Sequence, residues 1–286
     1  MNQKELIYNT DWDLLIIFDA CRYDYFKKYY PIILGDNFEH RFEKLISPAT
    51  WTGEWAAKTF KEPMPDTIFI SGERTVVNSK KDGFNKIRDF GDRLKYGIDT
   101  FECSHIFKEV VDVWLYAQDK SLGSHPATNP DVMFDEICGA FKVYPNDRIM
   151  AKYFQIHDPY LYLLDKGYKT FKLDRKIPAI IRKLISEIIS DETQWTIRRK
   201  LNFPADSWMS KVWYEQKRTG IIKGYCEDLI LMLHYVKTFM AYYPEKKIVV
   251  TADHGERLGE FGRYSHGGRR DKYVTEIPWL EIERRT

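Results

Sequence analysis

Two short apolar runs near opposite ends of the chain constrain its fold more than any other feature. Residues 14–18 (LLIIF) lead directly into Asp19, and residues 248–252 (IVVTA) lead directly into Asp253 and His254. Continuous rather than alternating apolarity is typical of a central parallel strand that is covered on both faces. Open α/β sheets bind their ligands at the carboxyl ends of such strands, so these acidic and imidazole side chains mark a candidate site.

Further strand and helix patterns alternate along the chain. Apolar runs predict strands at 67–72, 149–156, 247–251 and 277–282. Apolar residues at helical spacing predict a helix over 177–190 and one or two more within 206–243. Strands that alternate with helices predict an α/β fold with a mainly parallel central sheet and helices on both faces.

The length and apolar content fit a single large α/β domain spanning 1–286, because 44% of the residues are hydrophobic. Two segments, 75–145 and 160–215, are richer in polar, basic and aromatic residues. We interpret them as insertions or cap segments over the sheet. Loops over strand ends commonly carry specificity, so these segments are expected to shape a substrate pocket.

Charge and cysteine content exclude several functions. The 44 basic residues nearly balance the 42 acidic ones, and a net charge of +2 gives no general attraction to nucleic acid or to a membrane surface. The cysteines at 21, 103, 138 and 226 fit buried thiols in a reducing compartment better than disulfides or a zinc site.

The polar N-terminus is not a signal peptide, and 228–243 falls short of a membrane span. The sequence therefore predicts a soluble, cytoplasmic protein and leaves its oligomeric state open.

Four segments place chemically active side chains at predicted strand ends or turns. Those side chains are Asp19 and Arg22, Thr50 and Thr52, His157, and Asp253, His254 and His266. Each has an ordinary structural explanation, because an aspartate often caps a helix, threonines often occupy turns, and a lone histidine can close one. Together they supply ligands for a divalent metal, a nucleophile and positive charge, and this combination favours an active site.

The same segments resemble motifs of one enzyme superfamily. Residues 16–26 (IIFDACRYDYF) resemble the first-strand motif of the sulfatase-like branch of the alkaline phosphatase superfamily, and 47–55 (SPATWTGEW) resemble its nucleophile turn. Residues 155–160 (QIHDPY) resemble its His-x-Pro-Tyr strand end. Residues 251–268 (TADHGERLGEFGRYSHGG) are similar to the Asp-His-Gly-Glu stretch of sulfatases and phosphoethanolamine transferases. The resemblance implies an alkaline-phosphatase-like fold.

By position, the resemblance implies that Asp19, Asp253 and His254 bind a metal ion, and that Thr52 is both nucleophile and metal ligand. Sulfatases carry a cysteine, oxidised to formylglycine, where this chain has the threonine, so ordinary sulfatase chemistry is disfavoured. A threonine alkoxide suits phosphoryl transfer through a covalent phospho-enzyme. Thr50 remains an alternative nucleophile, since the alignment of residues 47–55 with the nucleophile turn of the family is not fixed by the sequence.

A metal ion explains how such a hydroxyl could react. A free threonine hydroxyl is too weak an acid at neutral pH, whereas coordination to a divalent cation favours the alkoxide. The same ion would offset the charge that develops on the phosphoryl group. We expect His157, His266 and Arg22 to contact the other oxygens of that group or to assist the leaving group.

We expect one divalent ion rather than two. Two-metal members of the superfamily add an Asp-x-x-x-His pair, but Tyr153 stands four residues before His157. Mixed carboxylate and imidazole ligands leave manganese, zinc, magnesium or calcium open.

The sequence thus predicts a metal-dependent phosphoric ester hydrolase or phosphotransferase acting on a small or sugar-bearing anionic ester. A sulfate-ester hydrolase with an unmodified threonine is one alternative, and a non-catalytic metal-binding protein that kept the fold is another. Relatives that transfer groups from lipids carry transmembrane helices that this sequence lacks, so a lipid donor is not expected. Many sulfatases continue into a smaller C-terminal subdomain, which we expect to be absent because the chain ends just after 277–282.

Overall fold

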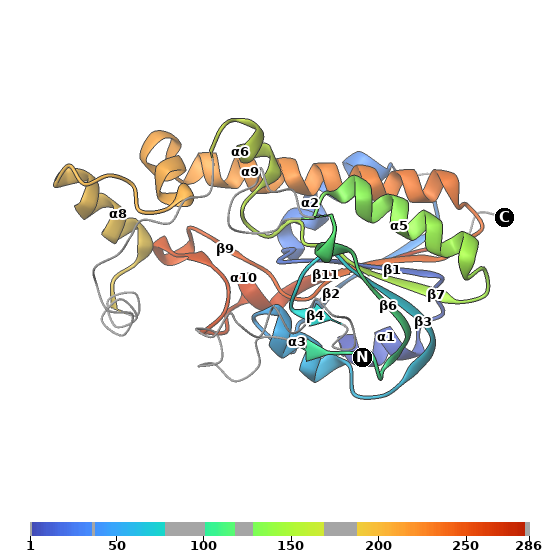
Figure 1. Ribbon diagram of the computed structural model, residues 1–286. Coiled ribbons are helices and arrows are strands. Elements are labelled where there is room, and N and C mark those ends of the chain that lie inside the picture. Colours follow the sequence, from blue (N-terminus) through green and yellow to red (C-terminus); the bar gives the residue numbers. More distant parts are fainter. Residues whose placement is uncertain (1, 36–37, 78–100, 118–127, 169–187, 284–286) are drawn as a thin grey trace.

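The computed structural model of the chain describes residues 2–35, 38–77, 101–117, 128–168 and 188–283 (Figure 1). Among them, seven strands form a central sheet in the order β2-β11-β8-β1-β7-β3-β6. These strands are β1 (Leu14–Phe18), β2 (His40–Ile46), β3 (Met64–Ser71), β6 (Phe107–Asp112), β7 (Arg148–Lys152), β8 (Ile248–Ala252) and β11 (Glu276–Ile282). Among the seven described strands of this sheet, β11 alone runs opposite to the other six, so the predicted mainly parallel sheet is confirmed.

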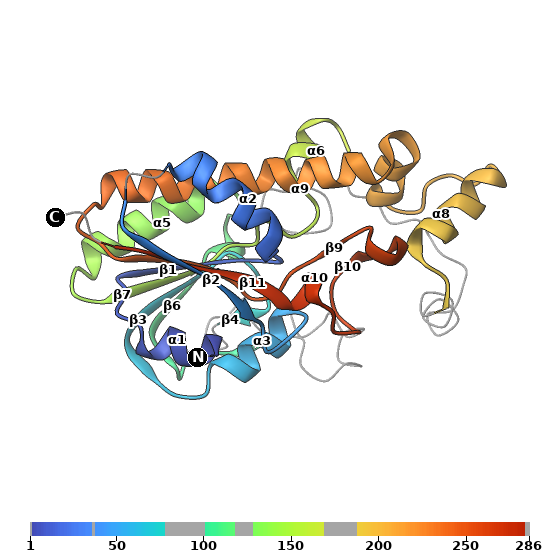
Figure 2. The same cartoon turned by 180° about the vertical axis from the view of Figure 1, so that it is seen from behind.

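Helices cover both faces of the sheet, as the sequence predicted. Helices α2, α5 and α9 lie over one face, and α1 and α3 lie over the other (Figures 1 and 2). Their bounds are α1 (Gln3–Asn9), α2 (Tyr23–Leu34), α3 (Thr52–Thr59), α5 (Pro130–Val143) and α9 (Trp208–Tyr242). Strands β1 and β8 are buried along their whole length between these layers, which explains their continuous apolarity.

The other described elements are short. Helices α6 (Leu161–Asp165) and α8 (Asp191–Lys200) contact α9. Two small sheets pair β4 (Val76–Val77) with β5 (Phe101–Glu102) and β9 (Arg257–Leu258) with β10 (Tyr264–Ser265). The 3-10 turns η2 (Val113–Leu115) and η4 (Glu260–Gly262) and the helix α10 (Lys272–Thr275) lie between longer elements.

Both edge strands of the sheet were missed from the sequence. Strand β2 (HRFEKLI) is mostly exposed and buries only Leu45, so it carries no apolar run. Strand β6 and helix α5 fall within 75–145, and both belong to the sheet layers. The interpretation of 75–145 as an insertion or cap is therefore wrong for these two stretches.

Other boundaries differ by a few residues. The strand predicted at 149–156 ends at Lys152, because the chain then turns across the edge of the sheet. The strand predicted at 67–72 begins earlier, at Met64. Most of the helix predicted over 177–190 lies outside the described residues.

Four neighbouring parallel strands end at one edge of the sheet. Strands β8, β1, β7 and β3 lie side by side, so the residues at or just beyond their carboxyl ends meet there. Those residues include the buried side chains of Asp253, Asp19, Lys152 and Glu73. The turn after β7 is bonded to the end of β1, since Asp19 donates its N–H to the Gln155 carbonyl and accepts the N–H of Ile156.

A buried glutamine connects α1 and α3 to this edge. The side-chain amide of Gln3 on α1 donates to the carbonyl of Ala252 (2.7 Å) and to the hydroxyl of Thr251 (3.1 Å) in β8. The side-chain oxygen of Gln3 accepts the indole N–H of Trp55 on α3 (3.0 Å). Helix α3 is thereby fixed relative to the strand end that carries Asp253.

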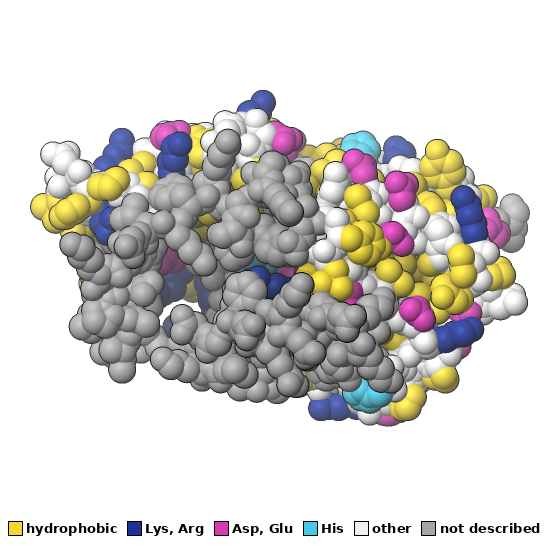
Figure 3. All heavy atoms as spheres, in the orientation of Figure 1, with side chains coloured by type: hydrophobic (Ala, Val, Ile, Leu, Met, Phe, Trp, Pro, Cys, Tyr) yellow, Lys and Arg dark blue, Asp and Glu magenta, His cyan; other side chains and the backbone are white. Residues whose placement is uncertain are grey.

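The surface of the described residues carries charges of both signs. On the face drawn in Figure 3, acidic and basic side chains of these residues are interspersed, which agrees with the net charge of +2. Among the described helices, including the long α9, none offers a stretch that is both apolar and long enough to cross a membrane.

Asp228, in the interior of α9, holds the start of α6. Its carboxylate accepts the backbone N–H groups of Leu161 (2.7 Å) and Tyr162 (2.9 Å), which fixes the chain directly after the 157–160 turn. Burial raises the pKa of Asp228 to about 7, although the two N–H donors favour the charged form.

Asp228→Asn should flatten the pH dependence of stability between the ordinary aspartate pKa of 3.8 and about 7. In this window the folded state binds a proton that the unfolded state has lost, so stability falls as the pH rises. The free energy of unfolding falls by about 1.4 kcal/mol for each pH unit that separates the two pKa values. Urea unfolding across the window measures the slope. Asp135→Asn, an exposed residue of α5, is the control, and an unchanged slope in the Asp228 variant would contradict the prediction.

Candidate active site

Asp253 follows β8 and is completely buried. Its Oδ1 accepts the backbone N–H groups of Ala20 (3.2 Å) and His254 (2.8 Å), which fix the carboxylate. Its Oδ2 accepts the hydroxyl of Thr52 at 2.7 Å. One carboxylate oxygen is therefore bonded to the backbone, and the other faces the candidate nucleophile.

Asp19 lies beside Asp253 because β1 and β8 are adjacent and parallel. Its Oδ2 is 3.4 Å from the Thr52 hydroxyl, and its Oδ1 is buried without a hydrogen-bond partner. Burial would raise the pKa of Asp19, but the positive charges of Lys152 and His266 hold it well below its ordinary value. Asp19 is therefore a carboxylate at neutral pH.

Thr52 is the first residue of α3, and its hydroxyl faces both carboxylates at the distances given above. Thr50, the alternative nucleophile, is also buried. The described hydrogen bonds of Thr50 involve its backbone: the carbonyl accepts the N–H of Gly267 (2.8 Å), and the N–H points to Glu54 (3.4 Å). This geometry favours Thr52 over Thr50.

His254 presents an unprotonated nitrogen to the same carboxylates. Its Nδ1 lies 2.9 Å from the carbonyl oxygen of Gly255, which can only accept, so Nδ1 carries the proton. In the neutral ring Nε2 then carries no proton, and it lies 3.5 Å from Asp19 Oδ1 and 3.5 Å from Asp253 Oδ2. Burial lowers the pKa of His254, which favours this neutral form.

Asp19, Thr52, Asp253 and His254, here called the ligand cluster, fit a divalent metal ion. Ligand atoms of the two aspartates and the histidine lie within 4.8 Å of one another. Asp19 Oδ1 and His254 Nε2 are buried without a hydrogen-bond partner, although buried polar atoms are nearly always satisfied. A cation placed among these atoms would satisfy both. Carboxylate, imidazole and hydroxyl donors suit zinc, manganese or magnesium.

Lys152 also contacts the ligand cluster and was not identified from the sequence. Its Nζ lies 2.9 Å from Asp19 Oδ2 and 3.1 Å from Asp253 Oδ2, and its side chain is 0% exposed. Burial would lower the pKa of Lys152, but the carboxylates of Asp19, Asp253 and Glu73 raise it, so the amine is charged. The available signal was a lysine that ends an otherwise apolar strand (IMAK).

His266 and His157 continue from His254 of the cluster in a row of three histidines. The ring centre of His266 is 4.4 Å from that of His254 and 4.8 Å from that of His157. Burial would lower the pKa of His266, but the charge of Glu256 and a 3.2 Å hydrogen bond to its carboxylate raise it to about 9. The structure therefore brings His157 and His266 to the predicted site, and His266 is positively charged at neutral pH.

Arg22 makes its described contacts away from the ligand cluster. Its guanidinium donates to both carboxylate oxygens of Asp24 (2.9 and 2.7 Å) and to Glu260 (2.9 Å). It also lies over the rings of Tyr25 and Tyr273, 4.8 and 4.9 Å from their centres. These contacts connect α2 with the segments after β8, and they differ from the substrate contact expected from the sequence.

The loop after β10 is bonded to the turn before α3. Gly267 donates its N–H to the carbonyl of Thr50 (2.8 Å). The guanidinium of Arg270 donates to the carbonyls of Ser47 (2.8 Å) and Pro48 (2.7 Å). These bonds fix the separation between the row of histidines and the turn that carries the candidate nucleophile.

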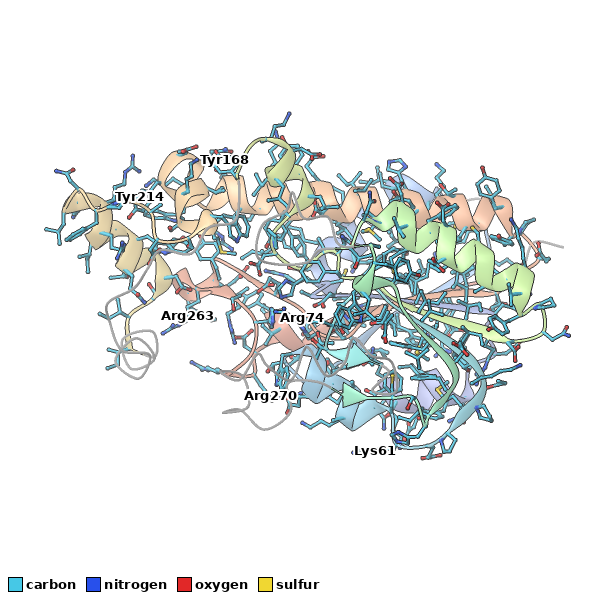
Figure 4. The ribbon with its side chains drawn as sticks, in the orientation of Figure 1. Lys61, Arg74, Tyr168, Tyr214, Arg263 and Arg270 are labelled. Carbon is cyan, nitrogen blue, oxygen red and sulfur yellow. The ribbon has the colours of Figure 1, made fainter. Side chains whose placement is uncertain are left out.

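Basic side chains gather on the same side of the molecule. Arg74, Arg263 and Arg270 lie on the side where the parallel strands end (Figure 4). Arg269, on the loop after β10, and Lys272, at the start of α10, are exposed. This distribution places positive charge where an anion would approach the ligand cluster.

An α/β sheet with a threonine and candidate metal ligands at its carboxyl edge is the arrangement that the sequence resemblance implied. Comparison with solved structures finds the same fold in phosphoethanolamine transferases, one of the enzyme classes that residues 251–268 resemble. No protein-family model matches the chain, and no curated protein matches it either.

The structural neighbours include phosphoethanolamine transferases. The soluble domain of lipooligosaccharide phosphoethanolamine transferase A from Neisseria meningitidis matches with a TM-score of 0.56 and 10% identity, over 94% of this chain and 75% of that one. The integral membrane form of the same transferase matches with a TM-score of 0.55 and 11% identity, over 96% of this chain and 48% of that one. This chain therefore spans about half the length of the membrane protein. The C-terminal periplasmic domain of EcEptC from Escherichia coli, in complex with zinc, matches with a TM-score of 0.53 and 12% identity, over 99% and 75% of the two chains.

Gly255→Ala should weaken both the fold and metal binding at the cluster. A Cβ atom at Gly255 would lie 2.2 Å from the backbone oxygen of Tyr273, so the 253–255 segment must move away from α10. We expect a loss of about 1–3 kcal/mol in unfolding free energy, as for other overpacked sites. Urea unfolding and metal titration measure the two effects.

Gly139→Ala is the matched control for this substitution. Gly139 lies inside α5 and has no atom within 4 Å of the Cβ position. Alanine there should stabilise the helix by roughly 0.5–1 kcal/mol. If the two alanine variants changed stability in the same direction, the steric explanation at Gly255 would be wrong.

Proposed function

We propose that the protein is a metal-dependent phosphoric ester hydrolase or phosphotransferase with Thr52 as its nucleophile. The observation that carries this proposal is the position of the Thr52 hydroxyl, 2.7 Å from Asp253 Oδ2 and 3.4 Å from Asp19 Oδ2 in a buried site. The shared fold with phosphoethanolamine transferases supports phosphate ester chemistry. The threonine in place of a sulfatase cysteine supports it further.

A divalent ion held by the ligand cluster would supply the positive charge that favours a threonine alkoxide and offsets charge on the phosphoryl group. Zinc is supported by the zinc complex of the EcEptC domain. Manganese and magnesium also suit the donor set, whereas calcium prefers six or more oxygen ligands.

In the proposed reaction a bond forms between Thr52 Oγ1 and phosphorus while the ester P–O bond breaks. The Thr52 hydroxyl already donates its hydrogen to Asp253, which gives the proton a path away from the nucleophile. His266, protonated at neutral pH, would donate a proton to the departing alcohol. Water in a hydrolase, or an acceptor alcohol in a transferase, then attacks the phosphorus and the bond to Thr52 Oγ1 breaks. The attacking hydroxyl would give its proton to His266, and Thr52 would recover its own from Asp253.

The proposed substrate is a small or sugar-bearing anionic phosphate ester. Lys152 and His266 place positive charge beside the ligand cluster, and Arg263 and Arg270 lie on the approach side. Positive charge in a concave site attracts and orients an anionic substrate. Comparing the turnover of aryl phosphates and aryl sulfates separates this proposal from its alternatives. A sulfate-ester hydrolase would prefer the aryl sulfate, and a non-catalytic metal-binding protein would turn over neither.

Thr52→Ala should reduce turnover of a chromogenic phosphate ester to below about one hundredth of wild type, because it removes the attacking oxygen. Thr52→Ser, which keeps a hydroxyl, should retain measurable turnover. Rapid quenching followed by mass spectrometry should locate a transient phosphate on the peptide that contains Thr52.

Thr50→Ala is the matched control, because it removes a buried hydroxyl from the same turn. We expect its turnover to stay within about tenfold of wild type, since the described bonds of Thr50 use its backbone. Full activity of Thr52→Ala, or loss of activity in Thr50→Ala alone, would refute the assignment of the nucleophile.

Removal of the metal should abolish turnover, and adding back zinc or manganese should restore it. Losing a residue that only supports a metal ligand typically weakens metal binding by roughly 10–100-fold. Asp253→Asn removes a direct ligand, so we expect the metal affinity to fall by at least that much. Calorimetric titration measures the affinity. Asp66→Asn, which removes a half-exposed carboxylate on β3, is the control, and equal affinities for the two variants would exclude Asp253 as a ligand.

A further inference from the structure

The ammonium group of Lys152 lies where a divalent ion would find its ligands. It stands between the carboxylates of Asp19 (2.9 Å) and Asp253 (3.1 Å), and the side chain is 0% exposed. Both contacts are made to Oδ2, the oxygens that also face the Thr52 hydroxyl. An ion in the ligand cluster would therefore share these oxygens with a cation that belongs to the chain.

Lys152 offsets part of the negative charge of the metal-free site. Two neighbouring carboxylates without a counter-charge repel each other and are costly to bury. Glu73, at the end of β3, adds a third acidic group whose charge acts on Lys152. Its carboxylate is held in place by the N–H groups of Thr75 (2.7 Å) and Val76 (3.2 Å). The ammonium is thus surrounded by acidic groups from three neighbouring strands.

The same ammonium opposes the binding of another cation. Like charges repel strongly over a few ångströms in a poorly solvated site, and Lys152 has no exposed surface through which water could screen it. A divalent ion that binds Asp19 and Asp253 must therefore bind against this repulsion. The ammonium of Lys152 would repel a second metal ion as well, which agrees with the expectation of a single metal.

We propose that Lys152 is a built-in counter-cation of the ligand cluster, which keeps the metal-free protein folded and weakens the binding of the divalent ion. This inference rests on the proposed metal-binding function of the site. Lys152 acts here through the carboxylates that it contacts, so it is a positioning residue rather than a catalytic one.

Lys152→Met tests the proposal in the full chain, because methionine keeps an unbranched side chain and removes the charge. We expect the Kd for Zn²⁺, measured by competition with a chromophoric chelator, to become about tenfold tighter or more. Lys152→Gln should shift the Kd in the same direction, and Lys152→Arg, which keeps the charge, should not. Lys108→Met is the control, since Lys108 pairs with Asp147 at 2.7 Å on a half-exposed surface.

Thermal unfolding provides a second measurement that does not depend on activity. In excess chelator, Lys152→Met should unfold at a lower temperature than wild type, because Asp19 and Asp253 have lost their counter-charge. Saturating Zn²⁺ should raise the unfolding temperature of the variant more than that of wild type, in line with its tighter binding.

The outcomes separate this inference from the proposed function. An unchanged or weaker Kd in both neutral variants overturns the inference, while metal binding and turnover by wild type would leave the function standing. Failure of both variants to fold even with Zn²⁺ also overturns it, because the ion should replace the missing charge. If wild type binds no Zn²⁺ but Lys152→Met does, the counter-cation is supported and the metal dependence of wild type is refuted. If neither wild type nor Lys152→Met binds Zn²⁺, both the inference and the proposed metal-dependent function are refuted.

Discussion

Two carboxylates that are buried next to each other govern the arrangement of the whole carboxyl edge. Asp19 and Asp253 follow adjacent parallel strands and are 3% and 0% exposed. Such a pair is costly unless cations or hydrogen-bond donors compensate it. The backbone supplies two N–H groups to Asp253, and Lys152 supplies an ammonium to both side chains. Asp19 Oδ1 and His254 Nε2 are among the buried atoms of the described residues that still lack a hydrogen-bond partner, and both could bind a cation.

Holding these carboxylates in place requires both helix layers of the fold. On one face, Gln3 bonds the end of β8 to Trp55, so α3 and its first residue keep their position beside Asp253. On the other face, Asp228 of α9 fixes the chain that follows His157. The site residues come from segments far apart in the sequence, and the sheet is what brings their strand ends together. A small cluster thus depends on a large scaffold.

Sequence patterns were informative where burial is complete and uninformative where it is partial. Strand β1 has the predicted bounds because a strand covered on both faces needs an apolar residue at every position, whereas the edge strands β2 and β6 tolerate charges and were missed. The proximity of Asp19, Asp253 and His254 was foreseeable because aspartate and histidine directly follow such strands. The contacts of Lys152 were not, because they depend on the order β8-β1-β7, which is a property of the tertiary fold. The contacts of Arg22 were not foreseen for the same reason, since its partner Glu260 lies more than two hundred residues away in the sequence.

The strand ends also explain how this fold can persist at 10–12% identity to its structural neighbours. Interior strand positions need only to be apolar and of suitable size, so many sequences satisfy them. Side chains at the carboxyl ends project beyond the packed layers, and exchanging one of them alters the charge of the site while the sheet pairing is retained. Lys152 occupies such a position, at the last residue of β7 and beside the end of β1. Exchanging this single lysine would change the charge beside Asp19 and Asp253, while the sheet pairing around it is retained.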